Sequence, residues 1–289
     1  MSQNTAVRLA REKAFHDRIA RGAHVGAEFA DRRLSASTPA GGTGISLRLC
    51  RDMLEAVGEP AGKKVLVLGC GMDSAGVWFA RHGAQVDAID ISPKSVDVQR
   101  RLADRLGLRI NATTADAHET GLPEASYDMV YGNAILHHLD CERAGREISR
   151  LLKPGGKAIF RDVAQGNVFL RLWRLLTPFW RTSDESPLRR SDYRTLGRIF
   201  ERVDVSFYVL AALPYLLFWR LGFVLLSKFG KAQSWRKNLS LCALCDRIDA
   251  ALLRAAPLLG SQAWLCIIRL RKPRRRPERS DTPDPGQLQ

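Results

Sequence analysis

The chain has 289 residues, of which 45% are hydrophobic, so its composition indicates a largely globular protein with one sizeable core. Its six cysteines lack the paired spacing of a zinc-binding module, and its first 21 residues lack the apolar stretch of a cleavable signal. We therefore expect a cytoplasmic protein with reduced thiols.

The net charge of +15 is unevenly distributed. Residues 165–289 hold 22 basic and 10 acidic side chains, a net of +12, whereas residues 1–164 hold 23 and 20, a net of +3. A basic region of this kind attracts phospholipid headgroups, nucleic acid or an acidic substrate. The alternative is a solvated basic face followed by a basic tail.

Residues 1–60 are expected to form an N-terminal helical lid. Residues 5–34 show a sparse helical pattern, and residues 35–44 are rich in Gly, Ser, Thr and Pro, as a loop is. Residues 45–57 regain an apolar helical stripe, which ends at Gly58.

From residue 61 the pattern changes to alternating strands and helices. The predicted strands are 64–68, 86–90, 109–114, 127–131 and 157–162, with a turn at Lys153–Gly156. The predicted helices are 74–82, 92–106 and 141–152. This alternation predicts an α/β fold with a Rossmann-like, mostly parallel sheet, right-handed crossovers and flanking helices.

Two further strands, at 200–210 and 263–270, would complete a seven-stranded sheet. The core would then comprise residues 61–210 and 263–271, with an apolar helical insertion, residues 211–262, between the last two strands. Residues 272–289 are rich in proline and charge, and we expect a disordered basic tail there.

Three loops at the carboxyl edge of this predicted sheet have chemistry suited to a nucleoside. Gly69-Cys70-Gly71 follows the first strand, where backbone N–H groups can face a ligand. Asp90 ends the second strand, where a carboxylate can accept hydrogen bonds from two ribose hydroxyls. Asp116-Ala117 follows the third strand, where a carboxylate can accept from an adenine amino group. Ser74 replaces the third glycine of the dinucleotide fingerprint, so a dinucleotide is disfavoured.

Five segments resemble, in chain order, the successive motifs of class I S-adenosylmethionine-dependent methyltransferases, in the small-molecule, type 11-like branch. These segments are Val65–Gly71, Val86–Ser92, Thr114–Ala117, Tyr127–Leu139 and Leu152–Gly156. The resemblance covers roughly residues 60–165. It implies the Rossmann-like fold and S-adenosyl-L-methionine as the cofactor.

The resemblance also implies cofactor-binding roles for the matching residues, which are Gly69, Cys70, Gly71, Asp90, Ile91, Asp116, Ala117 and Asn133. The glycine turn would approach the methionine part. The end of the second strand would hold the ribose and pack on the adenine, and the third loop would read the adenine edge. Asn133 would lie near the methionine amine and the methyl group.

Two positions depart from the family pattern. The family usually has a carboxylate where this chain has Val67, and a glycine where it has Asp73. The missing carboxylate should weaken the grip on the ammonium group of the cofactor. Asp73 could replace that charge from the next turn, and it is therefore a candidate cofactor-binding residue. Alternatively, Asp73 caps the following helix.

Methyl transfer needs a nucleophile in line with the activated methyl group inside a dry pocket. His138 is the candidate catalytic base, because histidine titrates near neutral pH and this one follows the fourth strand. Alternatively, His138 is bonded to the backbone at a helix start. His137, His16 and His24 are the other candidates. We expect no metal site.

Two apolar stretches, residues 168–180 and 210–226, mix leucines and aromatics with arginines, as helices lying in a membrane interface do. Pro214 and Arg220 argue against a spanning helix. The basic residues between 269 and 276 could add attraction to anionic lipid at the inner face of the membrane. Packing on the core and a dimer contact are the alternatives.

The acceptor is expected to be small or lipid-like, as in cell-envelope or secondary-metabolite biosynthesis. Nucleic-acid methylation is an alternative that the basic tail favours. Gly132-Asn133-Ala134-Ile135 argues against it, because enzymes that methylate exocyclic base amines usually have Pro-Pro and an aromatic residue there. A third possibility is a non-catalytic methyltransferase-like partner protein. The oligomeric state is not predictable from the sequence.

Overall fold

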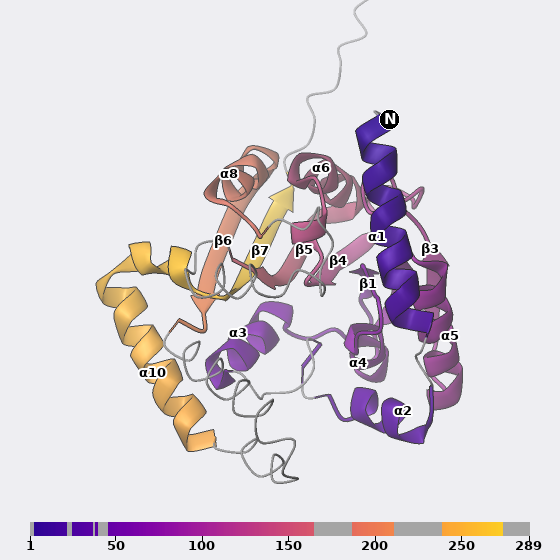
Figure 1. Cartoon of the computed structure of the whole chain (residues 1–289), viewed down its shortest axis with the longest axis horizontal. Helices are drawn as coiled ribbons and strands as arrows, with labels where there is room; N and C mark the ends of the chain where they lie inside the picture. Colours follow the sequence, from indigo (N-terminus) through magenta and orange to yellow (C-terminus); the bar gives the residue numbers. More distant parts are fainter. Residues whose placement is uncertain are drawn as a thin grey trace, which may run out of the picture.

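The computed structural model describes residues 3–21, 25–36, 38–39, 46–164, 187–210 and 239–273. This part of the chain is built around one seven-stranded sheet (Figure 1). The strands are β1 (Lys64–Leu68), β2 (Gln85–Asp90), β3 (Ile110–Thr114), β4 (Tyr127–Asn133), β5 (Leu152–Val163), β6 (Phe200–Tyr208) and β7 (Leu265–Pro273). Their order is β3-β2-β1-β4-β5-β7-β6. β1 to β5 are parallel and β7 is antiparallel to both neighbours, so the predicted mostly parallel α/β sheet is confirmed.

Helices pack on both faces of the sheet. One hydrophobic cluster lies between the sheet and α3 (Leu47–Val57), α4 (Ala75–Arg81), α5 (Pro93–Leu106) and α10 (Leu239–Ala255). The other lies between the sheet and α6 (Cys141–Leu151) and α8 (Arg190–Ile199). Two further helices, α1 (Gln3–Arg21) and α2 (Ala27–Leu34), contact α5. The sheet is therefore the middle layer of three.

Strand β1 shows why the sheet lies at the centre. Its side chains alternate between the two clusters, with Val65 and Val67 on one side and Leu66 and Leu68 on the other. All four are at most 2% exposed. Burying each of these side chains contributes about 1.5–3 kcal/mol relative to leaving it in water. The continuous apolar run thus forms a strand buried on both faces.

Caps fix the helix starts that follow β2 and β4. The Oγ atom of Ser92 accepts a hydrogen bond from Ser95 N at 3.1 Å, and Pro93 occupies the first turn of α5. The carboxylate of Asp140 accepts from the N–H groups of Glu142 and Arg143 at the start of α6. Both loops are therefore held at the carboxyl edge of the sheet.

Several element boundaries differ from the predictions. Residues 5–34, predicted as one helix, form α1 and α2, and Val25 and Gly26 between them are not helical. The predicted turn Lys153–Gly156 is part of β5, whose pairing with β4 shifts register between Tyr127 and Met129. Gly155 has φ +77°, which a glycine adopts without strain, so the strand can contain this irregularity. β4 runs on to Asn133, past its predicted end.

The region between β6 and β7 is described in part. Its described elements are α10 and the 3₁₀ helix η5 (Pro257–Gln262). The carboxylate of Asp246 on α10 accepts from Ser46 Oγ at 2.5 Å and from Arg48 N at 2.9 Å, which ties α10 to the start of α3. Residues 168–180, 211–226 and 274–289, which carry predictions made above, lie outside the described residues. No helix in the described ranges is both long and apolar enough to cross a membrane.

Candidate functional site

The glycine turn after β1 is shaped by close packing. Gly69 has φ +66° and Gly71 has φ +44°, a region that side chains disfavour. A Cβ atom on Gly69 would come within 2.6 Å of the Ile135 side chain. The turn lies between β2 and β4, where the chain first crosses to the other side of β1. Open α/β sheets bind ligands at the carboxyl edge of such a switch point.

The carboxylate of Asp90 is 7% exposed and faces this turn. One of its oxygens accepts a hydrogen bond from Gly71 N at 2.8 Å, and the other accepts from Ser92 N at 2.8 Å. Burial raises the pKa of Asp90 above its ordinary value, and the two N–H donors and His16 act against that rise. A pair of ribose hydroxyls would offer this desolvated carboxylate further donors. Ile91, next along the chain, is partly exposed at the same edge.

Gln99 on α5 binds the carbonyl groups of the glycine turn, a role that was not predicted from the sequence. Its Nε2 atom lies 3.2, 3.1 and 3.0 Å from the carbonyl oxygens of Cys70, Gly71 and Asp73, and the residue is fully buried. A buried polar group is retained when it satisfies other polar groups. The available signal was its place on the apolar stripe of α5, between Val96 and Leu102.

Asp73 and Asn133 meet across the switch point. Asn133 Nδ2 donates to Asp73 Oδ2, and Asp73 Oδ1 accepts from Ser74 N at 2.6 Å. Helix α4 starts after Ser74, whose own side chain makes no capping bond, so the bond from Ser74 N to Asp73 is the side-chain contact at this helix start. The hydroxyl group of Tyr131 is buried nearby and has no hydrogen-bond partner among the described residues. Burial, and after it the charge of Asp73, raises the pKa of that hydroxyl.

Asp116 and Ala117 occupy the loop after β3, as predicted from the pattern. Asp116 Oδ1 accepts from His118 N at 2.9 Å and pairs with His118 Nδ1 at 2.7 Å. Burial opposes the charge of Asp116, but the bonds from His118 outweigh it and hold the pKa below its ordinary value. His118 Nε2 in turn accepts from Asp140 N at 3.0 Å. The loop is thereby joined to the start of α6.

The two adjacent histidines after β4 have different surroundings. They belong to the 3₁₀ helix η1 (Leu136–His138). His137 is 5% exposed, and its Nδ1 atom lies 2.5 Å from Asp162 Oδ1 on β5. The other oxygen of Asp162 accepts from the N–H groups of Ile135 and Leu136. Asp162, which the sequence analysis also missed, therefore fixes the shape of this turn, and His137 is part of that support.

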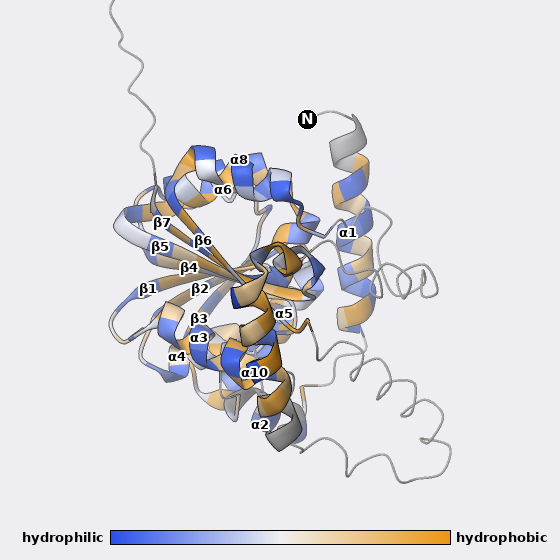
Figure 2. Ribbon diagram, turned by 90° about the vertical axis from the view of Figure 1, so that its left-hand side faces the viewer, coloured by the Kyte–Doolittle hydropathy of each residue, from blue (hydrophilic) through white to orange (hydrophobic). Residues whose placement is uncertain are grey.

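His138 points instead toward α1, which lies across the end of the sheet that carries the site (Figure 2). Its Nδ1 atom is 3.2 Å from Glu12 Oε2, and its carbonyl accepts from Arg8 at 2.8 Å. Asp17 on the same helix accepts from Ser92 Oγ at 2.6 Å. Burial, with help from the neighbouring histidines, lowers the pKa of His16, although Asp90 and Glu12 oppose the shift. His24 lies outside the described residues.

Comparisons with known proteins point to one family. A family described as methyltransferase domain matches residues 66–160. A ubiquinone biosynthesis O-methyltransferase of Xanthomonas axonopodis pv. citri is 38% identical over 101 residues, which are 34% of this chain and 42% of that protein. A ribosomal RNA small subunit methyltransferase C of Chromohalobacter salexigens is 35% identical over 119 residues, which are 38% of this chain and 35% of that protein. The chain thus covers less than half of either relative.

A solved structure shares the fold as a whole. Geranyl diphosphate C-methyltransferase of Streptomyces coelicolor, in complex with S-adenosyl-L-homocysteine, superposes with a TM-score of 0.53 at 15% identity, and the match covers 77% of each chain. The chain therefore shares its fold with the geranyl diphosphate C-methyltransferase. Residues 66–160 therefore match a methyltransferase domain, as the motifs in this part of the chain led us to expect.

Proposed function

We propose that the chain transfers the methyl group of S-adenosyl-L-methionine to a small or lipid-like acceptor. The observation that carries this proposal is the meeting of Asp90, the glycine turn and the Asp73–Asn133 pair at the switch point beneath α1. In the reaction, the methyl–sulfur bond breaks as the acceptor–methyl bond forms, and S-adenosyl-L-homocysteine leaves. The acceptor loses its proton to a base or to solvent.

The cofactor contacts are proposed as follows. The turn Gly69–Gly71 approaches the methionine part, and Asp90 accepts from the two ribose hydroxyls while Ile91 packs on the adenine. Asp116 and Ala117 contact the adenine edge. Asp73, oriented by Asn133, binds the ammonium group in place of a carboxylate at Val67. Val67 is buried in the core, with 2% exposure, and it has no carboxylate to pair with the ammonium group of the cofactor.

His138 is proposed to assist proton removal from the acceptor. It follows β4, and it lies beneath α1, where a pocket closed by that helix would exclude water. Residues 1–60 would form the lid, and residues 61–210 with 263–271 would form the core. Residues 211–262 would be an insertion that borders the acceptor pocket.

A small-molecule acceptor is supported by the likeness to the ubiquinone O-methyltransferase. The likeness to the ribosomal RNA enzyme and the net charge of +12 in residues 165–289 support a nucleic-acid acceptor. Gly132–Ile135 after β4 lacks the Pro-Pro-aromatic pattern typical of enzymes that act on base amines. We therefore favour the small molecule.

The test is transfer of a radiolabelled methyl group from S-adenosyl-L-methionine to host-cell extracts divided into lipid, small polar and RNA fractions. We expect label in a lipid or small-molecule fraction, and a loss of about 100-fold in turnover with His138→Ala, the lower end for removal of an acid–base group. Asp128→Asn, on the opposite edge of the sheet, is the matched control. Label in RNA alone would overturn the acceptor class. Cofactor binding without transfer to any fraction would favour a non-catalytic partner protein.

We also propose that the protein associates with anionic membrane at the cytoplasmic face. Helix α10 exposes an apolar row at helical spacing, with Leu244, Ile248 and Leu252 exposed by 51%, 41% and 40%. Arg247 and Arg254 lie on the same helix. Apolar side chains flanked by arginines suit an interfacial helix, and the basic C-terminal region adds attraction to anionic lipid.

Liposome flotation measures this association. We expect co-flotation with vesicles containing anionic phospholipid, less with neutral vesicles, and less again at high salt, because screening weakens the electrostatic part. Leu244→Gln with Ile248→Gln should reduce it, while Glu201→Gln on β6 should not. Absence of co-flotation in every condition would exclude membrane contact.

A further inference from the structure

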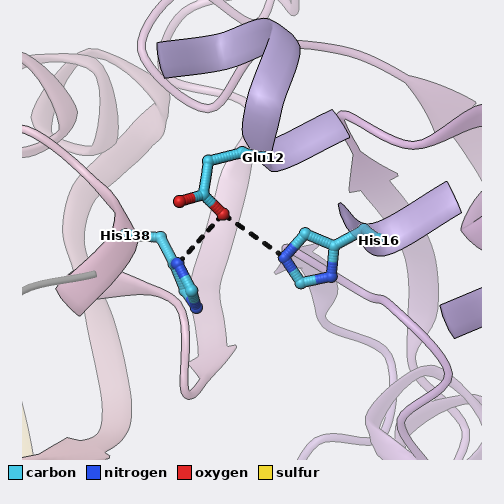
Figure 3. Close-up of side chains that lie close together, drawn as sticks. All are labelled: Glu12, His16 and His138. Atoms are coloured by element: carbon cyan, nitrogen blue, oxygen red, sulfur yellow. Dashed lines mark ion pairs between the residues drawn. The ribbon is translucent and has the colours of Figure 1, made fainter. Parts of the chain in front are cut away.

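Three side chains that could bind a metal ion converge where α1 meets η1. Glu12 and His16 are four residues apart on α1, so they share one face of the helix, and His138 comes from η1 (Figure 3). Glu12 Oε2 lies 3.2 Å from His138 Nδ1 and 3.7 Å from His16 Nε2. The three ligand atoms all lie within 4.8 Å of one another.

The two separations from the Glu12 oxygen fit the edges of a tetrahedral coordination shell. When nitrogen and oxygen ligands lie about 2.1 Å from a zinc ion, neighbouring ligand atoms are separated by about 3.4 Å. The two distances from the Glu12 oxygen lie on either side of that value. Two histidines and one glutamate form a known catalytic zinc set, which leaves the fourth position open. Imidazole nitrogen also disfavours magnesium and calcium, which prefer all-oxygen sites.

The charges around the cluster favour a cation. Glu12 is 5% exposed, the carboxylate of Asp90 lies close to His16, and that of Asp17 lies close to Asp90. Arg8 on the same helix donates to the carbonyl oxygen of His138.

We propose that Glu12, His16 and His138 bind one zinc-like divalent cation, which joins α1 to η1 over the cofactor site. The role that we assign to the cation rests on the proposed function. The cation would hold α1, the helix of the proposed lid, closed over the cofactor site. Its open position would take the acceptor oxygen, whose proton would then pass to solvent more readily. His138 would thus assist proton removal as a ligand of the cation.

The binding test uses the full chain, freed of any purification tag and treated with a chelator. Calorimetric titration with Zn²⁺ should show one ion per chain, and Co²⁺ should give the visible absorption bands of a tetrahedral site. Glu12→Gln, His16→Ala and His138→Ala should each weaken binding by about 100-fold or more, since even supporting residues of metal sites cost 10–100-fold. His82→Ala is the control, because that histidine stacks on Trp78 outside the cluster.

Two results would overturn the metal site. One is that the wild-type chain binds no more ion than a variant with all three substitutions. The other is that the single variants bind the ion as the wild type does. Either result would leave only a cluster of polar contacts. Circular dichroism establishes that each variant is folded. A separate titration with S-adenosyl-L-methionine distinguishes the two proposals. Metal binding without cofactor binding would reject the proposed function alone, and cofactor binding without metal binding would reject the cation alone.

Discussion

Asp73 and Asn133 are 60 residues apart in the chain, yet their side chains are joined. Each is unremarkable by itself, since an aspartate before a helix usually caps it and an asparagine after a strand usually ends it. Together they place an oriented carboxylate beside the glycine turn. This pairing supports the proposed charge role of Asp73, whereas its bond from Ser74 N at the start of α4 is the contact that a structural role would use.

Replacement of Asp73 by alanine tests that role. The variant should bind S-adenosyl-L-methionine about 10–100-fold more weakly, because a hydrogen bond to a charged group contributes about 1.5–3 kcal/mol. Calorimetry measures the affinity, and Asp128→Asn, at the start of β4 and away from the glycine turn, is the control. If Asp73→Ala binds the cofactor as tightly as the wild type, Asp73 is structural.

At the scale of elements, the turn after β4 depends on a buried carboxylate of the neighbouring strand. Asp162 on β5 is 1% exposed and binds His137 and the N–H groups of Ile135 and Leu136. Burial opposes its charge, but His137 and the N–H donors prevail and lower the pKa of Asp162. β5 therefore fixes the position of η1, and with it that of His138.

The lowered pKa of Asp162 predicts a pH-dependent contribution to stability. The ionised group stabilises the fold at pH values above its unfolded pKa of about 3.9, and this contribution is lost as the pH falls through the lower folded value. Asp162→Asn should cost about 3–5 kcal/mol of unfolding free energy at pH 7, as when one partner of a buried ion pair is removed. The difference from the wild type should shrink in acid.

Urea denaturation at pH 7 and at about pH 2.5, well below the unfolded pKa of an aspartate, measures this effect. Asp128→Asn is the matched control, because Asp128 also has a lowered pKa, held down chiefly by Lys153 against burial, but lies near the surface. Its loss should cost at most about 1 kcal/mol. Equal losses for the two variants would contradict the structural role of Asp162.

At the scale of the whole molecule, local patterns predicted the sheet well. β1 to β5 and the helices between them follow from apolar runs, caps and glycine turns, because these signals act within a few residues. The loops proposed to bind the cofactor lie together as predicted, since parallel strands bring their carboxyl ends to one edge. The register irregularity in β5 could not be predicted, because Lys153–Gly156 has the composition of a turn. Only its pairing with β4 shows that this segment belongs to a strand.

The contacts that complete the site could not be predicted. Glu12 meets His138, Gln99 holds the glycine turn and Asp17 meets Ser92 only because distant elements pack together. A polar residue on an amphipathic helix carries no local signal of such a partner. The weak apolar pattern of residues 5–34 likewise gave no sign that α1 crosses the carboxyl edge of the sheet.

Calorimetric titration with S-adenosyl-L-methionine, comparing the wild type with Asp90→Ala, tests the account at its centre. The wild type should bind one cofactor per chain. Asp90→Ala should bind about 100-fold more weakly, because two hydrogen bonds to a carboxylate, at about 1.5 kcal/mol each, amount to about 3 kcal/mol. A wild type that binds no cofactor, or an Asp90→Ala variant that binds it equally well, would contradict the assignment of the site.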